Sequence, residues 1–257
     1  MKPERVIIGF EKGDERAREI MRELYEPFLR TGKPLMEMSN ESAEVCKYAC
    51  NAILATKISF MNQIAGFCAE VGADVNEVRK GMGADPRIGP QFLFPGVGFG
   101  GSCFPKDINA LLAAAEKLGV KMDLLKAVRE VNDRQKTLMV DMVKKHFGRD
   151  LSGRKGAVWG LSFKPRTDDV REAPALVVIR LLLERGARIR AYDPEALDNT
   201  RRLLGESITY CDDAYHACRD ADALLVLTEW NEFRRPDFER IRSLLKQPVI
   251  FDGRNVY

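Results

Sequence analysis

The chain has 257 residues, which is room for one large domain or two ordinary ones. Hydrophobic residues make up 45% and charged residues 31%, which excludes a disordered or fibrous chain. The 41 Lys and Arg residues barely exceed the 38 Asp and Glu residues, so no nucleic-acid partner is predicted. No uninterrupted apolar run approaches the roughly 18 residues of a membrane span, and the N-terminus lacks a signal-peptide core. We therefore expect a cytoplasmic protein without a membrane partner.

The N-terminal part of the chain predicts a short strand at 4–10 and an amphipathic helix at 13–30. Two elements cannot bury both of their faces, so we expect them to be the end of a larger sheet. Apolar residues at spacings of three and four predict one long helix over 39–72, which would span about 50 Å. Few small domains bury such a length alone, so this helix is a candidate dimer seam. A second helix is predicted near 74–83.

The middle of the chain contains a glycine- and proline-rich segment at 84–104, which is predicted to be a loop. The loop carries several phenylalanines, so we expect it to be packed. Helices are predicted at 105–118 and 123–147. From Gly153 onward, short apolar strands alternate with helices, and this pattern predicts a doubly wound parallel sheet.

Cysteine usage gives no sign of a metal site or a disulfide framework. None of the six cysteines forms a CxxC pair, and the chain has only two histidines. The best zinc candidate, Cys211-x4-His216-x-Cys218, lacks the spacing of a zinc finger. We expect reduced thiols and no metal, with Cys46 and Cys50 as small buried residues.

The first candidate site is the run GGSCFPKD, from Gly100 to Asp107. A glycine pair lets the backbone approach a ligand closely. Cys103 precedes a predicted helix N-terminus, where free amides and the helix dipole favour a thiolate, and Lys106 adds positive charge. Asp107 lies one helical turn further on, where it can hold a water or a proton. The pattern predicts an activated nucleophile beside an acid-base group; the alternative is a cysteine buried in a tight loop.

A second candidate is the pair Lys47 and Asn51 on the long helix, which share a face because they are four residues apart. Asparagine is unfavourable inside a helix and needs a hydrogen-bond partner if buried. The pair therefore predicts a bound polar ligand or water, with an ordinary surface pair as the alternative.

Two polar segments follow strands of the predicted sheet. GLSFKPRTDDVR (160–171) follows its first strand, and DGRN (252–255) follows its last. Both lie at the carboxyl edge, where such sheets bind ligands. Lys164 and Arg171 suit a phosphate group, whereas the alternative is a solvated charged loop. No GxGxxG follows this strand, so the dinucleotide fingerprint is not predicted here.

Four segments together, GVGFGGSCFPKD, KYACNAILATKISFMNQIA, GLSFKPRTDDVRE and DGRN, resemble the UDP-glucose/GDP-mannose dehydrogenase family. The resemblance covers nearly the whole chain in the family's order and spacing. It implies oxidation of UDP-glucose to UDP-glucuronate in two steps with NAD as cofactor. It also implies a homodimer joined through the long helix 39–72.

The resemblance assigns roles to individual residues. Cys103 matches the nucleophile that forms a thiohemiacetal and then a thioester. Lys47 and Asn51 match the donors to oxyanionic intermediates, and Asp107 matches the acid-base partner of the hydrolytic water. Residues that match the UDP-sugar site are Phe92, Leu93, Phe94, Pro95, Gly96, Gly100, Phe163, Lys164 and Arg254, together with Arg87 donated across the dimer. Residues that match NAD contacts are Lys106 and Arg171, whereas Lys57 matches a structural position.

The resemblance also implies that the chain consists of three regions. Residues 1–33 match a remnant of the NAD-binding domain, 34–148 a helical central dimerisation domain with the cysteine loop, and 149–257 a Rossmann-like UDP-sugar-binding domain. No GxGxxG follows a first strand, and nothing matches the family's catalytic glutamate. We therefore expect a fragment that does not oxidise substrate by itself.

Other interpretations stay open at this point. Sibling enzymes act on GDP-mannose or on UDP-N-acetyl sugars, but the latter usually carry His where Ser102 stands, and the former differ over 86–99. These features favour UDP-glucose. A nucleotide-sugar-binding or dimerising module without chemistry is a second alternative, and the reactivity of Cys103 would distinguish it. A plain α/β domain with solvated loops leaves the coincidence of four motifs unexplained.

Overall fold

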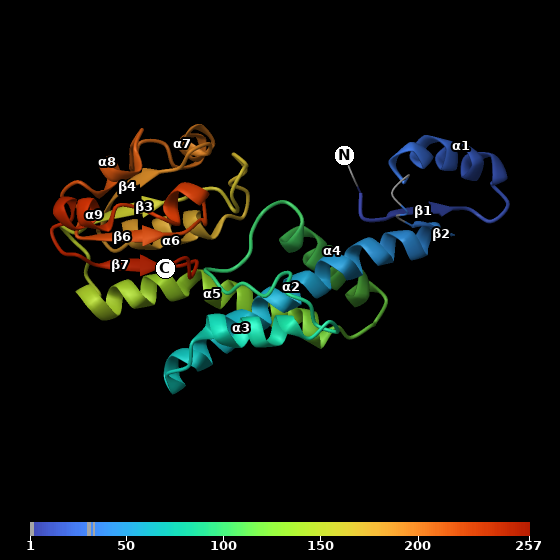
Figure 1. The fold of residues 1–257 in the computed structure, drawn as a ribbon, viewed down its shortest axis with the longest axis horizontal. Helices are drawn as coiled ribbons and strands as arrows, with labels where there is room; N and C mark the ends of the chain where they lie inside the picture. Colours follow the sequence, from blue (N-terminus) through green and yellow to red (C-terminus); the bar gives the residue numbers. More distant parts are fainter. Residues whose placement is uncertain (1–2, 30–31, 33) are drawn as a thin grey trace. The chain divides into compact units, whose positions relative to one another are not determined.

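A computed structural model describes residues 3–29, 32 and 34–257 of the chain (Figure 1). The structure divides into two compact units, Met1–Ile53 and Leu54–Tyr257. Helix α2 (Asn40–Val71) contributes its first part to one unit and its second part to the other. The predicted α/β class, with a long helix and a parallel sheet, is confirmed.

The first unit is a small β-α-β arrangement. Strand β1 (Val6–Phe10) pairs in parallel with β2 (Leu35–Ser39), and α1 (Glu15–Tyr25) with the short helix η1 (Glu26–Phe28) lies between them in the chain. The sequence analysis missed β2, because the apolar and polar residues of its sequence, LMEMS, do not alternate strictly. Register and pairing, which are long-range features, define this strand.

The apolar face predicted for the first helix is exposed in this unit. Ile20, Leu24 and Phe28 are 50%, 56% and 45% exposed, and no residue of α1 is buried. A two-stranded sheet has too little apolar area to cover a helix. Cys46 and Cys50 are also only half-buried, and Arg5 Nη2 lies 3.2 Å from the Cys50 sulfur. The expectation that these two thiols are buried is therefore wrong for this unit.

Helix α2 agrees with the predicted 39–72 to within a residue at each end. The Ser39 hydroxyl accepts a hydrogen bond from Ser42 N–H at 3.2 Å, and Gly72, at φ +74°, ends the helix. Among the described residues, this one helix is long and apolar enough to cross a membrane, on length and composition alone. This test uses the average hydropathy of a window, whereas the sequence analysis considered uninterrupted apolar runs, so the two criteria differ for α2. The core helix of a soluble protein passes the same test, and a third of the stretch is buried, so the finding carries no membrane assignment.

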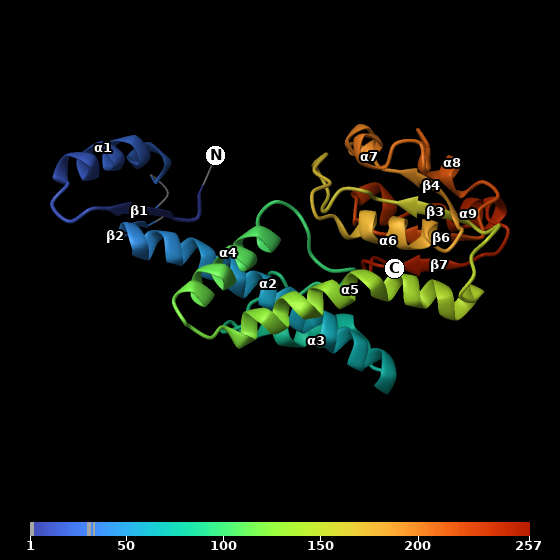
Figure 2. The same ribbon diagram turned by 180° about the vertical axis from the view of Figure 1, so that it is seen from behind.

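The helical part of the second unit packs the end of α2 against three further helices (Figure 2). They are α3 (Val75–Ala84), α4 (Phe104–Lys117) and α5 (Asp123–Phe147). Buried side chains from α2, α4, α5 and the loop before α4 form a shared core: Ala55, Phe99, Ile108, Leu112 and Val128. Pro105 lies in the first turn of α4, and Gly119, at φ +69°, follows its end.

The other part of the second unit is a parallel sheet of five strands in the order β5-β4-β3-β6-β7. Strand order reverses at β3, which is the switch point of a doubly wound fold. Its elements in chain order are β3 (Lys155–Trp159), α6 (Pro174–Leu183), β4 (Arg188–Tyr192), α7 (Leu197–Leu204), β5 (Thr209–Tyr210), α8 (Ala214–Cys218), β6 (Ala223–Val226), η2 (Asn231–Phe233), α9 (Phe238–Leu244) and β7 (Ile250–Asp252).

Helices cover both faces of this sheet. Val158 of β3 faces a core that includes side chains of α5 and α6, whereas Trp159 faces a core that includes α8 and α9. This alternation follows from the pleat of the strand. Helix α5 runs out of the helical part to lie against α6 and β7, so it joins the two parts of the unit (Figures 1 and 2).

Candidate functional site

A cavity of about 420 Å³ opens in the second unit, where the loop before α4 meets the carboxyl edge of the sheet. Its lining includes residues that the sequence analysis predicted for the UDP-sugar site, namely Phe92, Phe94, Gly96, Gly100, Phe163, Lys164 and Arg254. It also includes residues that the analysis missed, namely Ile58, Gln91, Gly98, Phe99, Phe104 and Glu229. Segments more than 60 residues apart in sequence therefore form one concave site, the usual form of a small-molecule pocket.

One wall of the cavity is aromatic. The ring of Phe104 contacts those of Phe92 and Phe99 at centroid distances of 6.1 and 5.8 Å. Phe92 has a positive φ of 63°, which is unusual for an aromatic residue and indicates that the surroundings hold it in place. Lys57 Nζ donates to the carbonyl of Ile88 at 2.6 Å, and this bond supports the structural role predicted for Lys57.

The glycine run before Cys103 is shaped by close packing. Gly96, Gly98 and Gly101 do have G-x-G-x-x-G spacing, but the segment before them is irregular and not a strand, so the dinucleotide motif is absent from this position. Gly98 has φ +99°, and a Cβ there would lie 2.9 Å from Asn132 Oδ1. Gly101 has φ +83°, and a Cβ there would lie 2.7 Å from the Phe163 ring. Only glycine fits these positions.

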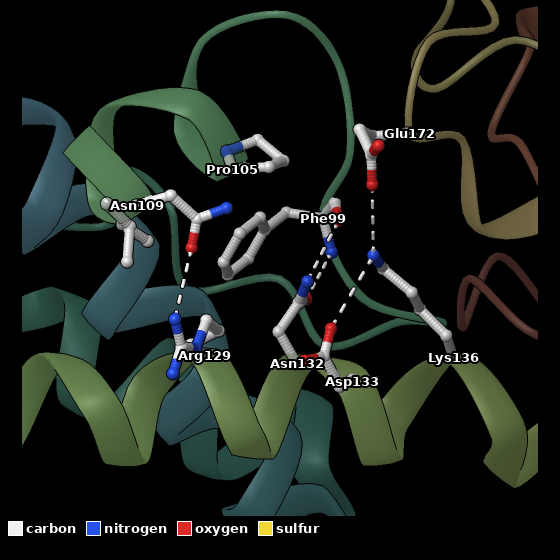
Figure 3. A pocket seen from close by; sticks show the side chains of 9 residues that line it. Phe99, Pro105, Asn109, Arg129, Asn132, Asp133, Lys136 and Glu172 are labelled. Carbon is white, nitrogen blue, oxygen red and sulfur yellow. Dashed lines mark hydrogen bonds and ion pairs between the residues drawn. The ribbon is translucent and has the colours of Figure 1, made fainter. Parts of the chain in front are cut away.

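Helix α5 holds this loop through buried polar side chains (Figure 3). Asn132, which is 3% exposed, accepts from Phe99 N–H at 2.7 Å and donates to Phe99 C=O at 3.1 Å. Gln135 Nε2 donates to the Gly96 carbonyl at 2.7 Å. Figure 3 also shows Lys136 reaching between Asp133 and Glu172, each 3.8 Å away, beside a small cavity of about 80 Å³. Sequence reasoning missed these anchors, because they depend on which helix face meets the loop.

The lining also carries cationic groups. Arg254 Nη2 forms an ion pair with Glu229 at 2.5 Å, and both side chains are largely buried. Asp252 Oδ1 accepts the Arg254 N–H at 3.0 Å, which fixes the turn after β7. Lys164 Nζ lies 5.2 Å from the centroid of the Phe163 ring. Two cations beside aromatic rings can hold an anionic, partly planar ligand.

Cys103 is exposed and occupies the N-cap position of α4, directly before the cavity-lining Phe104. The adjacent loop is tied to the sheet edge, because Gly101 N–H donates to the Arg171 carbonyl at 2.8 Å. The pKa of Arg171 is raised, chiefly by its hydrogen bonds to Asp169 and further by attraction to that carboxylate and to Cys103. The pKa of Asp169 is correspondingly lowered by Arg171.

Asp107 and Lys106 lie in the first turn of α4, which directly follows Cys103. Asp107 is 1% exposed, and its carboxylate accepts a hydrogen bond from Lys106 Nζ. Asp107 N–H also donates to the Cys103 carbonyl at 2.8 Å, so the predicted acid-base group lies one helical turn from the predicted nucleophile. The proximity of the two residues is confirmed, whereas their roles stay predictions.

Several predicted residues lie outside the cavity lining. Leu93 is 1% exposed, and the Pro95 carbonyl accepts from Asn255 Nδ2 at 3.5 Å. The Arg87 side chain is 88% exposed and pairs with Asp85 at 2.6 Å, which lowers the pKa of Asp85. Lys47 and Asn51 belong to the first unit, one helical turn apart on α2, and their assignment to this site stays a prediction. In the described part of the chain, no group of three metal-ligating acidic, cysteine or histidine side chains is clustered.

The fold and the cavity together define a doubly wound α/β protein with a cavity at the edge of its sheet, lined by rings and cations that suit an anionic, partly planar ligand. Comparison with known proteins then identifies its family. Residues 41–134 match the central domain of the UDP-glucose/GDP-mannose dehydrogenase family, and residues 157–257 match the UDP binding domain of the same family. The chain belongs to this family, as the sequence motifs predicted.

Individual relatives agree with this assignment. The UDP-glucose 6-dehydrogenase of Pseudomonas aeruginosa is 48% identical over 261 residues, covering 100% of this chain and 57% of the relative. TuaD, a UDP-glucose 6-dehydrogenase of Bacillus subtilis, is 48% identical over 257 residues, covering 100% and 54%. The structure of a UDP-glucose dehydrogenase from Pyrobaculum islandicum superposes with a TM-score of 0.91 at 39% identity, covering 99% and 56%. The chain thus spans a little over half the length of the relatives it matches.

Proposed function

We propose that this chain binds UDP-glucose in the 420 Å³ cavity and serves its NAD-dependent oxidation to UDP-glucuronate. The observation that carries the proposal is the convergence of the cysteine loop, Phe163–Lys164 and Arg254 on one cavity. The family match to a UDP binding domain over 157–257 supports the same ligand class. The relatives named as UDP-glucose 6-dehydrogenases favour glucose over the sibling sugars.

The cavity suits a nucleoside diphosphate sugar in both shape and charge. The guanidinium of Arg254 and the ammonium of Lys164 would meet the diphosphate. The rings of Phe92, Phe99 and Phe104 would cover the flat faces of the base or sugar. Because Arg254 already pairs with Glu229, a bound phosphate would share or replace that carboxylate.

In the proposed chemistry, the Cys103 sulfur adds to the carbonyl carbon of the aldehyde stage and forms a C–S bond. The carbonyl oxygen then carries the negative charge, and Lys47 and Asn51 are the donors that the family resemblance assigns to it. Asp107 would accept a proton from the water that cleaves the later thioester. The exposure of Cys103 beside a cavity-lining residue supports the first of these roles.

NAD, when bound, supplies the hydride acceptor for both oxidations. Lys106 and Arg171 are the proposed contacts, and their side chains are 62% and 69% exposed near Cys103. Two accessible cations fit the phosphates of a dinucleotide. Each is paired with a carboxylate in this structure, so a phosphate would compete with Asp107 or Asp169.

The assembly that we propose is a homodimer joined through the long helix. Apolar side chains at spacings of seven or eight residues on α2 are exposed, namely Val45, Ile53, Phe60 and Phe67 at 57%, 56%, 46% and 65%. A second copy of the helix would cover this stripe. Exposed Arg87 would then exchange its ion pair with Asp85 for the neighbouring site, as the resemblance implies. We retain domain boundaries at 33/34 and 148/149 as part of this proposal.

Calorimetric titration with UDP-glucose tests the proposed function, with GDP-mannose as the comparison ligand. We expect saturable binding of UDP-glucose and weaker binding of GDP-mannose. Arg254→Ala should weaken UDP-glucose binding by about tenfold to a hundredfold, because a buried charge-assisted contact is lost. Arg242→Ala, at an exposed position on α9, is the matched control and should leave binding unchanged.

Two other outcomes of this titration would contradict the proposed substrate or the proposed site. Preference for GDP-mannose would contradict the substrate and move the protein to a sibling activity. Failure to bind either ligand would contradict the proposed site, provided that the circular dichroism spectrum shows a folded chain.

A further inference from the structure

Asp193, directly after β4, is a carboxylate enclosed entirely by hydrogen-bond donors. It is 0% exposed. Its Oδ1 accepts from the N–H groups of Glu195 and Ala196, both at 2.9 Å. Its Oδ2 accepts from Leu161 N–H at 2.7 Å, Ser162 N–H at 3.1 Å, Ser162 Oγ at 3.2 Å and Trp230 Nε1 at 3.1 Å. All of these partners are donors, so the negative charge is satisfied without a buried cation among them.

The position of Asp193 is notable for a doubly wound sheet. In dinucleotide-binding folds, an acidic residue after the second strand hydrogen-bonds the ribose hydroxyls. Strand β4 is the second strand of this sheet, next to β3. A carboxylate offers about four acceptor directions, and the protein donors already occupy them. Asp193 therefore has no capacity left for a ribose.

The donors to Asp193 come from two loops that reach the cavity. Leu161 and Ser162 immediately precede the cavity-lining Phe163 and Lys164, and Trp230 immediately follows the cavity-lining Glu229. The loops are also joined directly, because Thr228 Oγ1 donates to the Ser162 carbonyl at 2.6 Å. Asp193 thus fixes the loop after β3 and the loop after β6 from behind the cavity.

We infer that Asp193 is a positioning residue for the ligand site, and that it sets the places of Lys164 and of the Glu229–Arg254 pair through these two loops. The inference rests on the proposed nucleotide-sugar site and adds a residue that does not line the cavity. In a dinucleotide-binding fold, the acid at this position binds the ribose. Here it organises the loops that carry Lys164 and Glu229, which line the proposed nucleotide-sugar site.

The negative charge, rather than the size of the side chain, carries this role. Asp193→Asn keeps the shape but turns one acceptor oxygen into an NH₂ group that faces other donors. The lost bonds leave buried N–H groups unpaired. We expect the affinity for UDP-glucose to fall by about tenfold or more. Asp237→Asn is the matched control, because Asp237 caps α9 through Arg240 N–H at 2.9 Å, and asparagine caps helices equally well.

The test combines calorimetry with the indole N–H signals of ¹⁵N-labelled protein. The chain has two tryptophans. Trp230 donates to Asp193, whereas Trp159 donates to the Ala214 carbonyl at 2.7 Å and serves as an internal reference. In Asp193→Asn, we expect the Trp230 signal to move, the Trp159 signal to stay, and UDP-glucose affinity to fall. An unmoved Trp230 signal or unchanged affinity in a folded variant would overturn the inference.

A second variant covers the case in which Asp193→Asn does not fold. Trp230→Phe removes one donor and keeps the carboxylate. We expect it to weaken UDP-glucose binding by about threefold to tenfold. The indole N–H signal of Trp159 should stay at its original position. Unchanged affinity would overturn the inference. If the unaltered chain does not bind UDP-glucose, the proposed function fails, and the Trp230 signal in Asp193→Asn still decides whether Asp193 holds the loops.

Discussion

Gly101 lies so close to the ring of Phe163 that a Cβ on the glycine would stand 2.7 Å from ring carbon Cε2. The glycine belongs to the loop that carries Cys103, and the phenylalanine follows the first strand of the sheet. Their contact, with the hydrogen bond from Gly101 N–H to the Arg171 carbonyl, holds the loop of the predicted nucleophile against the edge of the sheet.

We predict that Gly101→Ala destabilises the chain by about 2 to 5 kcal/mol, because it adds a steric clash to the cost of a positive φ. It should also weaken UDP-glucose binding. Gly119→Ala is the control, since Gly119 has φ +69° with no neighbour within 4 Å of a Cβ, and it should cost about 1 kcal/mol. Urea denaturation gives both values. Equal losses in the two variants would mean that the contact with Phe163 is unimportant.

We predict that Asn132→Ala costs about 2 to 4 kcal/mol, because it leaves the buried N–H and C=O of Phe99 without their partner. Asn109→Ala removes an exposed asparagine whose Oδ1 lies 3.4 Å from Arg129, and it should change stability by at most about 0.5 kcal/mol. The free energy of unfolding from urea titration measures the difference. A loss no larger for Asn132 than for Asn109 would show that α5 does not anchor the loop.

We predict that Cys103 is the first thiol to react with iodoacetamide near neutral pH, because it is exposed, whereas Cys211 and Cys218 are buried. Burial raises the pKa of Cys218 to about 12, which keeps that thiol protonated and unreactive. Mass spectrometry of peptides reads out each site, and Cys103→Ser should abolish the fast phase. UDP-glucose should protect Cys103. A slow, unprotected Cys103 would favour a binding module without cysteine chemistry.

We predict that alkaline conditions destabilise the sheet-containing part of the chain. Burial raises the pKa of Cys218 from 9.0 to about 12, and that of Tyr192 from 10.0 to about 12. Both groups stay neutral in the folded chain at pH values where the unfolded chain has already released their protons. Unfolding therefore releases protons in this window, and the free energy of unfolding falls as pH rises from about 9 to about 12.

Urea midpoints measured across this range check the sign and the source. Cys218→Ala removes one of the two titrating groups and should make the decline shallower. An unaltered slope in this variant would exclude Cys218 as a contributor, and a rise in stability with pH would contradict the burial of both groups.

The sequence by itself determined most of the local structure and the protein family. Helical periodicity located α2, and alternation of strands with helices predicted the parallel sheet. These are short-range patterns that each segment carries in its own residues. The motif resemblance placed Phe163, Lys164 and Arg254 at one site because related chains keep the same order of segments.

Only the tertiary structure decided which side chains meet. Strand β2 exists through its pairing with β1, and Glu229, Asn132 and Asp193 gain their roles from groups roughly 25 to 37 residues away in the chain. Nothing in the local pattern separates Asp193, enclosed by donors, from any other aspartate after a strand. Burial and hydrogen-bond satisfaction are properties of the packed chain, and here they convert an acid at the usual ribose position into the anchor of two cavity loops.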